Sequence, residues 1–323
     1  MALYVVPLAP ADTPRLTLAE WDRLRACEAV WFENPVHPLL NRLLEADVKA
    51  GPFDDEPDAS RDGWALVCDP HSSRILALAR RGAEVSAGEV DVPDPLTAAH
   101  TAPILRRAAA SLGAVAAIMA RLRSDDGCPW DVKQTHASLA VNLLEEAYEV
   151  LDEIDRGIVG QELEEELGDV LLQVAFHSRI AQQDGRFDLC DVADRLVAKL
   201  VHRHPHVFGD LEVSGAEEVL RNWDTLKAQE KQREDPFDGI PRGLPALLAA
   251  AKVQKRAEKL GFEAPPAGEA EARASDAVQR YAATGREEDL GDCLFWLVAG
   301  ARARAQDPEA ALRRKVARFR DSL

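Results

Sequence analysis

Cysteine is scarce in this sequence. The five cysteines are scattered, odd in number and form no Cys-x-x-Cys pair: Cys27, Cys68, Cys128, Cys190 and Cys293. This pattern argues against a disulfide framework and against a zinc site built from thiolates. We therefore expect reduced thiols and a cytoplasmic protein.

Long apolar runs are also lacking. The first segment, MALYVVPLAPADTP, has neither the basic start nor the extended apolar stretch of a signal peptide. No uninterrupted apolar run reaches the roughly 18 residues that a membrane-spanning helix requires. The sequence therefore predicts no membrane partner.

Positive charge is in deficit. Lysine and arginine number 39 against 56 acidic residues, which gives a formal net charge of -17 at pH 7. An acidic surface repels the phosphate backbone, so we expect no duplex nucleic acid partner. A phosphorylated small molecule is still compatible with an acidic protein as its ligand, because a divalent cation can join carboxylates to phosphates.

The 323 residues are enough for two or three domains. Residues 1–103 alternate expected strands with helices and predict a small α/β domain with a parallel sheet. The expected strands are Leu3–Leu8, Val30–Phe32 and Trp64–Cys68, and the expected helices follow Thr17, His37 and Ser72. We expect a loop over Gly51–Asp62 and a linker over Asp91–Pro103, since both stretches are rich in proline.

Apolar periodicity predicts helices through the rest of the chain. Residues 104–235 form one expected helical domain, and the alanine-rich residues 236–323 form another. The helices of the first are expected at about 104–123, 138–156, 161–183, 188–203 and 215–233. The predicted fold class is thus mainly α, with helical bundle domains preceded by the small α/β domain.

A faint internal repeat relates the two helical regions. The segment Glu165–Asp169 (EELGD) returns 123 residues later as Glu288–Asp292 (EDLGD). The same shift places Glu269 opposite Glu146 but loses the other acidic positions of that helix: Glu145 and Glu149 fall on Gly268 and Ala272. We therefore expect the second copy to be degenerate, inactive and structural.

Carboxylates gather on one face of two consecutive helices in the first copy. On a helical wheel, one stripe lies within an arc of about 60° and comprises Asn142, Glu146, Glu149 and Glu153. The next helix carries a similar stripe of Glu162, Glu166, Asp169 and Gln173. Antiparallel packing, which the short connection favours, would bring Glu146, Glu149, Glu166 and Asp169 together.

Four converging carboxylates need a cation to neutralise them. Hard oxygen donors without histidine or cysteine suit Mg²⁺, with Mn²⁺ as the alternative. A merely solvated acidic face would have cations four positions further on, where this sequence has residues such as Glu153 and Gln173. A di-iron site would need Glu-x-x-His, but the i+3 residues are Glu149 and Asp169.

The acidic pattern resembles the signature of the MazG family of all-α nucleoside triphosphate pyrophosphohydrolases. It consists of Glu145-Glu146-x-x-Glu149 followed, after 16 residues, by Glu166-x-x-Asp169. Further segments strengthen the resemblance: Gly127–Asp131 (GCPWD), Gln134–His136 (QTH), Arg203–Phe208 (RHPHVF) and Asn222-Trp223. The first 103 residues are similar to a truncated tetrapyrrole methylase but have no glycine-rich cofactor loop.

The resemblance implies Mg²⁺-dependent hydrolysis of nucleoside triphosphates, over a broad house-cleaning range, to the monophosphate plus pyrophosphate. It also implies a homodimer. Matched by motif, the implied metal ligands are Glu146, Glu149, Glu166 and Asp169, the phosphate contacts are Lys199 and Arg203, and Trp223 packs on the base. Glu145 is implied as general base or holder of the nucleophilic water, with an indirect role equally open.

Two alternatives stay open. One is a narrower relative that acts on dUTP, dCTP or phosphoribosyl-ATP. The other is a regulatory or scaffold protein that uses the acidic face to bind a partner.

Overall fold

The computed structural model describes residues 2–53, 63–230, 235 and 237–323. They form two compact units, each made of two stretches of chain. The first unit comprises Met1–Glu145 and Gly168–Val219, and the second comprises Glu146–Leu167 and Leu220–Leu323. Three of the described helices have residues in both units: α7 (Ala140–Arg156), α8 (Gln161–Gln183) and α11 (Ala216–Gln229).

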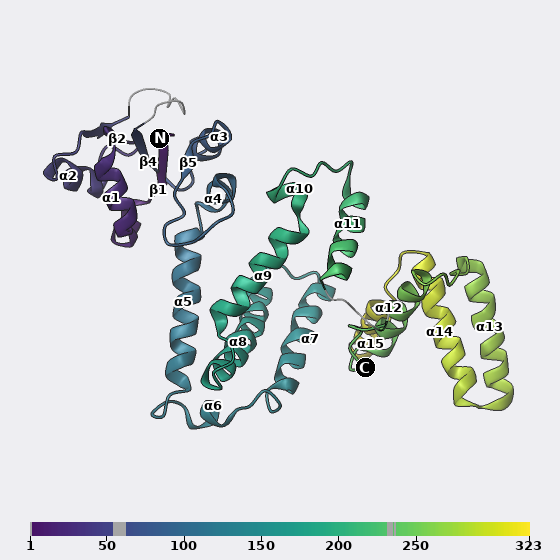
Figure 1. The fold of residues 1–323 in the computed structure, drawn as a ribbon. Coiled ribbons are helices and arrows are strands. Elements are labelled where there is room, and N and C mark those ends of the chain that lie inside the picture. The colour runs from purple at the N-terminus through teal and green to yellow at the C-terminus, as the bar shows by residue number, and fades with distance from the viewer. Residues whose placement is uncertain (1, 54–62, 231–234, 236) are drawn as a thin grey trace. The chain divides into compact units, whose positions relative to one another are not determined.

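The N-terminal part of the first unit is a parallel five-stranded sheet in the order β3-β2-β4-β1-β5 (Figure 1). Its strands are β1 (Tyr4–Pro7), β2 (Ala29–Phe32), β3 (Ala50–Pro52), β4 (Trp64–Cys68) and β5 (Glu84–Val85). Successive residues of β1 point to opposite faces, so Val5 and Val6 belong to different core clusters. The predicted α/β fold of the N-terminal region, with its parallel sheet, is confirmed.

Short helices cover this sheet. They are the 3-10 helix η1 (Pro10–Arg15) and the α-helices α1 (Leu18–Ala26), α2 (Pro38–Glu45), α3 (Arg74–Arg80) and α4 (Pro95–Thr101). Thr17 and Glu20 form the capping box that starts α1, as the sequence predicts. The prediction of a linker over Asp91–Pro103 was wrong, because α4 lies within it. The expected loop contains β3 and otherwise extends over residues 54–62, outside the described part of the chain.

The remaining helices of the first repeat follow the predicted periodicity closely. They are α5 (Leu105–Leu122), α7, α8, α9 (Leu189–Arg203) and α11 (Ala216–Gln229), with two short helices, α6 (Pro129–Lys133) and α10 (Pro205–Phe208), between them. The expected end of α11, residues 231–233, lies outside the described residues. No single described helix is long and apolar enough to cross a membrane, although α4 and α5, bent by 79°, pass that test as a pair.

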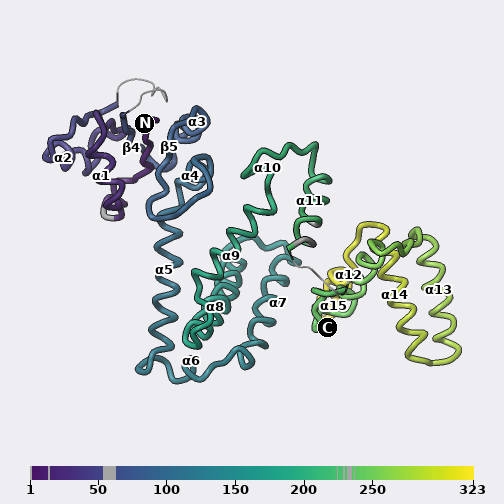
Figure 2. Tube along the Cα trace, viewed as in Figure 1, coloured from purple at the N-terminus to yellow at the C-terminus, as the bar shows by residue number. Residues whose placement is uncertain are grey.

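The C-terminal helices belong to the second unit: α12 (Ala246–Glu258), α13 (Ala267–Thr284), α14 (Glu287–Ala303) and α15 (Pro308–Arg320). Gly285, with φ of 64°, ends α13 in the left-handed conformation and reverses the chain into α14 (Figure 2). Ala270, Ala274 and Ala277 are buried along α13, and their small side chains let the two helices pack closely. Gln254 of α12 donates a hydrogen bond to the Phe295 carbonyl, 2.8 Å away.

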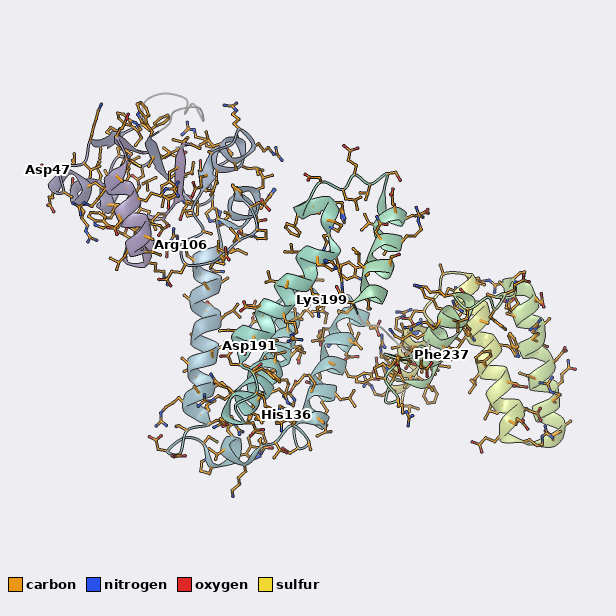
Figure 3. The ribbon with its side chains drawn as sticks, in the orientation of Figure 1. Asp47, Arg106, His136, Asp191, Lys199 and Phe237 are labelled. Atoms are coloured by element: carbon orange, nitrogen blue, oxygen red, sulfur yellow. The ribbon has the colours of Figure 1, made fainter. Side chains whose placement is uncertain are left out.

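A buried ion pair attaches α5 to the α/β domain. Arg106, labelled in Figure 3, binds the Glu20 carboxylate and also donates to the carbonyls of Arg15 (3.2 Å) and Pro7 (3.4 Å). The two side chains are only 11% and 3% exposed. Burial alone would raise the pKa of Glu20, but hydrogen bonds from Arg106, Ser86 and Thr17 outweigh it and lower the pKa.

Replacing Arg106 tests this attachment. Arg106→Met leaves the Glu20 carboxylate buried without its cation, and we expect the α/β domain to lose about 3 kcal/mol. Urea unfolding followed by tryptophan fluorescence measures the loss. Because the folded pKa of Glu20 lies below its ordinary 4.5, the pair stabilises the fold above that pH and stops doing so as pH falls through the folded pKa. The difference between the two proteins should therefore shrink in acid.

Arg15→Met is the matched control, because Arg15 forms an exposed ion pair with Asp12. Equal losses from the two substitutions would contradict the anchoring role of Arg106.

Candidate metal site

Three glutamates lie close together in the parts of α7 and α8 that belong to the second unit. Glu146 and Glu149 are three residues apart on α7, so one turn of that helix presents both side chains on one face. Glu166 of α8 joins them, and one carboxylate oxygen from each residue lies within 4.8 Å of the other two. The convergence predicted from the helical wheel is thus present for these three residues.

The donor set fits a hard divalent cation. Mg²⁺ binds oxygen at about 2.1 Å in an octahedron, so ligand oxygens lie about 3 Å apart when adjacent and about 4.2 Å apart when opposite. Oxygens that already lie within 4.8 Å need only a small contraction to reach those separations. The cluster contains no thiolate or imidazole, which favours Mg²⁺ or Mn²⁺ over softer metals.

A tight turn connects the two glutamate-bearing helices. Gly157, with φ of 72°, takes the left-handed conformation that ends α7. The Ile158 amide then donates to the Glu153 carbonyl, 3.0 Å away. The Glu153 side chain is buried and accepts a hydrogen bond from Arg156 (2.6 Å), so this member of the predicted stripe binds an arginine within α7.

The other predicted site residues are on the same and neighbouring helices. Asp169, half-buried, follows Glu166 by one turn of α8 but belongs to the first unit and is not one of the three clustered residues. Glu145 is exposed on α7. On α9, Lys199 (labelled in Figure 3) is exposed and Arg203 is buried, whereas Trp223 is half-buried on α11 in the second unit.

Residues that precede α7 contact α8 within the first unit. Arg123 is buried and donates to the side chain of Gln183 (2.8 Å) and to the carbonyls of Asp131 and Gln134. Trp130 contacts Phe176 edge to face, at 6.4 Å between ring centroids. Arg123 therefore holds the GCPWD and QTH segments through the carbonyls of Asp131 and Gln134, and Trp130, itself 57% exposed, contacts α8.

A histidine pair was missed by the sequence reasoning. The rings of His136 and His177 lie 3° from parallel, with their Nδ1 atoms 2.7 Å apart, so one of these nitrogens must carry the proton. Burial, and then the neighbouring His136, lowers the pKa of His177. His136 is within a quoted motif, but its partner is 41 residues away and gives no local signal.

The histidines His204 and His206 of the RHPHVF segment lie at the junction of α9 and α10. His204 Nδ1 donates to the Leu200 carbonyl at 2.7 Å, and Pro205 starts the short helix α10. Among the described residues, the group able to hold a metal is the glutamate cluster alone.

The second repeat pairs its carboxylates with arginines instead. Arg280 donates from Nε to Asp289 (3.1 Å) and from Nη2 to Asp292 (2.9 Å), the residues aligned with Glu166 and Asp169. Hydrogen bonds from Thr284 and Arg280 lower the pKa of Asp289, which is buried. The remaining aligned carboxylate, on Glu269, binds Arg273 at 2.5 Å.

Comparison with known proteins gives a consistent result. Residues 134–208 match the model of the MazG nucleotide pyrophosphohydrolase domain. The chain is 40% identical over 215 residues to the nucleoside triphosphate pyrophosphohydrolase of Escherichia coli K12, covering 62% of this chain and 81% of that protein. It is 40% identical over 208 residues to the nucleoside triphosphate pyrophosphohydrolase/pyrophosphatase MazG of Thermotoga maritima, covering 62% and 80%. The Mycobacterium tuberculosis nucleoside triphosphate pyrophosphohydrolase is 45% identical over 166 residues, covering 51% and 50%.

Neutralising one glutamate tests the metal assignment directly. Glu149→Gln keeps the size of the side chain but removes one anionic donor, so Mn²⁺ affinity measured by calorimetry should fall at least about tenfold, about 1.4 kcal/mol. Glu164→Gln is the matched control, because Glu164 is an exposed acid of α8 outside the cluster. Unchanged Mn²⁺ binding by a folded Glu149→Gln protein would remove this residue from the ligand set.

Proposed function

The chain belongs to the MazG family of nucleoside triphosphate pyrophosphohydrolases, and on that premise we propose that the α7–α8 glutamate cluster is where it hydrolyses its substrate. Water adds across the anhydride between the α- and β-phosphoryl groups, and the products are the nucleoside monophosphate and pyrophosphate. The observation that carries this proposal is the convergence of Glu146, Glu149 and Glu166 within 4.8 Å.

The proposed metal is Mg²⁺, with Mn²⁺ as a substitute. Glu146, Glu149 and Glu166 would hold it, together with Asp169 one turn further along α8. When bound, such a cation neutralises phosphate oxygens and lowers the pKa of a coordinated water. Glu145, beside the ligands on α7, is the proposed general base, or else the residue that orients the attacking water.

Substrate contacts come from two other helices in this proposal. Lys199 and Arg203 are four residues apart on α9, so their side chains share one helix face and would stabilise the charge of the departing pyrophosphate. Trp223 would pack on the base. Stacking of this kind tolerates different bases, which supports a broad substrate range.

The decisive assay measures nucleotide turnover by the purified protein. We expect equal amounts of monophosphate and pyrophosphate from several ribo- and deoxyribonucleoside triphosphates in Mg²⁺, and none after chelation. Turnover restricted to dUTP, dCTP or phosphoribosyl-ATP would show a narrower enzyme. Absence of any Mg²⁺-dependent turnover would overturn the proposed function and leave a scaffold role.

We further propose that residues 104–235 contain the catalytic residues and that residues 236–323 are a copy without activity. The support is the Arg280 guanidinium, which already binds both aligned aspartates of the second copy. Asp169→Asn should therefore abolish turnover, whereas Asp292→Asn should change it less than about twofold, as an exposed substitution away from the site does. Equal losses in two folded variants would mean that the second copy also catalyses.

The protein is proposed to be a homodimer. Large apolar side chains are exposed on the helices of the first repeat, among them Val141 (56%) and Leu144 (54%) on α7 and Leu196, Val197 and Leu200 on α9. Val141 and Leu144 are one turn apart and form an apolar face. Exposed apolar faces of this kind are covered in a symmetric dimer, where each copy covers the same face of its partner.

Light scattering tests the assembly. We expect a mass twice that of the 35.4 kDa chain and, for Val141→Glu/Leu144→Glu, the mass of one chain, because burial of two carboxylates opposes association. Val36→Glu, at an exposed apolar position before α2, is the control and should stay dimeric. A fully active monomer of the unchanged protein would contradict the proposal.

The compartment proposed is the cytoplasm. All five cysteines are free thiols in the structure, which supports an environment that keeps thiols reduced.

A further inference from the structure

The turn between the glutamate-bearing helices is bound by the C-terminal helix. Asp155, in the last turn of α7, accepts a hydrogen bond from Nε of Arg313 at 2.6 Å and another from Nη1 of Arg314 at 3.1 Å. Both arginines are on α15, about 158 residues further along the chain, and all three residues belong to the second unit. The Asp155 side chain is 14% exposed and that of Arg313 is 26% exposed, whereas Arg314 is 49% exposed.

Asp155 is in an unfavourable place for an acid. The unpaired carbonyls at the C-terminal end of a helix carry partial negative charge, which repels a carboxylate in the last turn. The hydrogen bond from Arg313, followed by that from Arg314, lowers the pKa of Asp155 and keeps the group ionised. The ionised form of Asp155 is therefore stabilised by the arginines of α15 and not by α7 itself.

Helix α15 is itself fixed within the second repeat. It packs against α12 and α14, and its first turn is capped by Asp307, whose side chain accepts from the Ala310 amide at 3.1 Å. Ala310 is buried in the same turn. A contact with α15 therefore connects the α7–α8 turn to a packed helical body.

The contact is close enough to the cluster to set its geometry. Asp155 follows Glu149 by six residues, which is about 9 Å along a rigid helix. Glu166 is in the second turn of α8, just beyond the same connection. Any sliding or rotation of the turn would therefore shift the ligand oxygens of both helices, and Mg²⁺ tolerates little departure from an octahedron.

We propose that Asp155, Arg313 and Arg314 are positioning residues, through which the catalytically silent second repeat sets the metal affinity of the first. The inference rests on the proposed function of the glutamate cluster. In this proposal the C-terminal repeat affects the reaction but contributes no residue that touches the substrate or the metal.

Steady-state kinetics at varied Mg²⁺ test this role in the full-length protein. For Asp155→Asn we expect the half-saturating Mg²⁺ concentration to rise about tenfold, the size of effect seen when a ligand's supporting partner is removed. Turnover at saturating Mg²⁺ should stay near that of the unchanged protein, because the ligands themselves are intact. Mn²⁺ calorimetry without nucleotide should show the same loss of affinity.

Three further variants separate positioning from general stabilisation. Arg313→Gln should reproduce the effect, and Asp155→Asn/Arg313→Gln should add little to either single change, since both remove one contact. Asp155→Glu, which retains the charge, should recover most of the Mg²⁺ affinity. Lys315→Gln removes the same charge from an exposed position of α15 and should have no effect.

The measurements separate a failure of the positioning role from a failure of the proposed function. If the unsubstituted protein is active, an equal Mg²⁺ requirement in Asp155→Asn overturns the proposal. A lower melting temperature of Asp155→Asn without loss of Mn²⁺ affinity overturns it as well. If the unchanged protein shows no Mg²⁺-dependent turnover, the proposed function fails. The Mn²⁺ measurement still tests the positioning of the cluster in that case.

Discussion

Electrostatic repulsion among Glu146, Glu149 and Glu166 is the constraint on which the candidate metal site depends. Two unit charges 4 Å apart repel by about 1 kcal/mol in water and by about 4 kcal/mol near a protein surface. Three carboxylates within 4.8 Å of one another therefore favour separation of α7 from α8. The covalent turn at Gly157 opposes that separation, and a bound cation reverses the sign of the interaction.

The two repeats differ in how the repulsion between their carboxylates is offset. In the second, the Arg280 guanidinium joins Asp289 and Asp292, and its donors are fixed in direction by its planar geometry. A divalent cation held by the first repeat keeps coordination positions for water and phosphate oxygens. An arginine in place of a metal would thus keep the two helices together while removing the open positions that the proposed catalysis requires.

Helical periodicity was sufficient to predict the core of the candidate site. Because residues three or four apart share a helix face, the positions of Glu146, Glu149 and Glu166 followed from sequence once antiparallel packing was assumed. The strands β3 and β5 were missed because two or three residues give no measurable alternation. Helix α4 was taken for a linker because proline interrupts helices as well as starting them, and here Pro95 starts the helix. The contacts of His136 with His177 and of Asp155 with Arg313 join distant residues, so no local pattern could reveal them.

The position of Asp155 also bears on why a repeat without the glutamate cluster is attached to one that has it. The family match ends at residue 208, yet the arginines that hold the α7–α8 turn are on α15, beyond residue 308. Mg²⁺ selects for ligand geometry, and repulsion among the three glutamates opposes the close approach that this geometry needs. The second repeat no longer needs an open metal position, because its carboxylates are satisfied by Arg273 and Arg280. Its packed helices can therefore act as a rigid support for the hairpin that retains the glutamates.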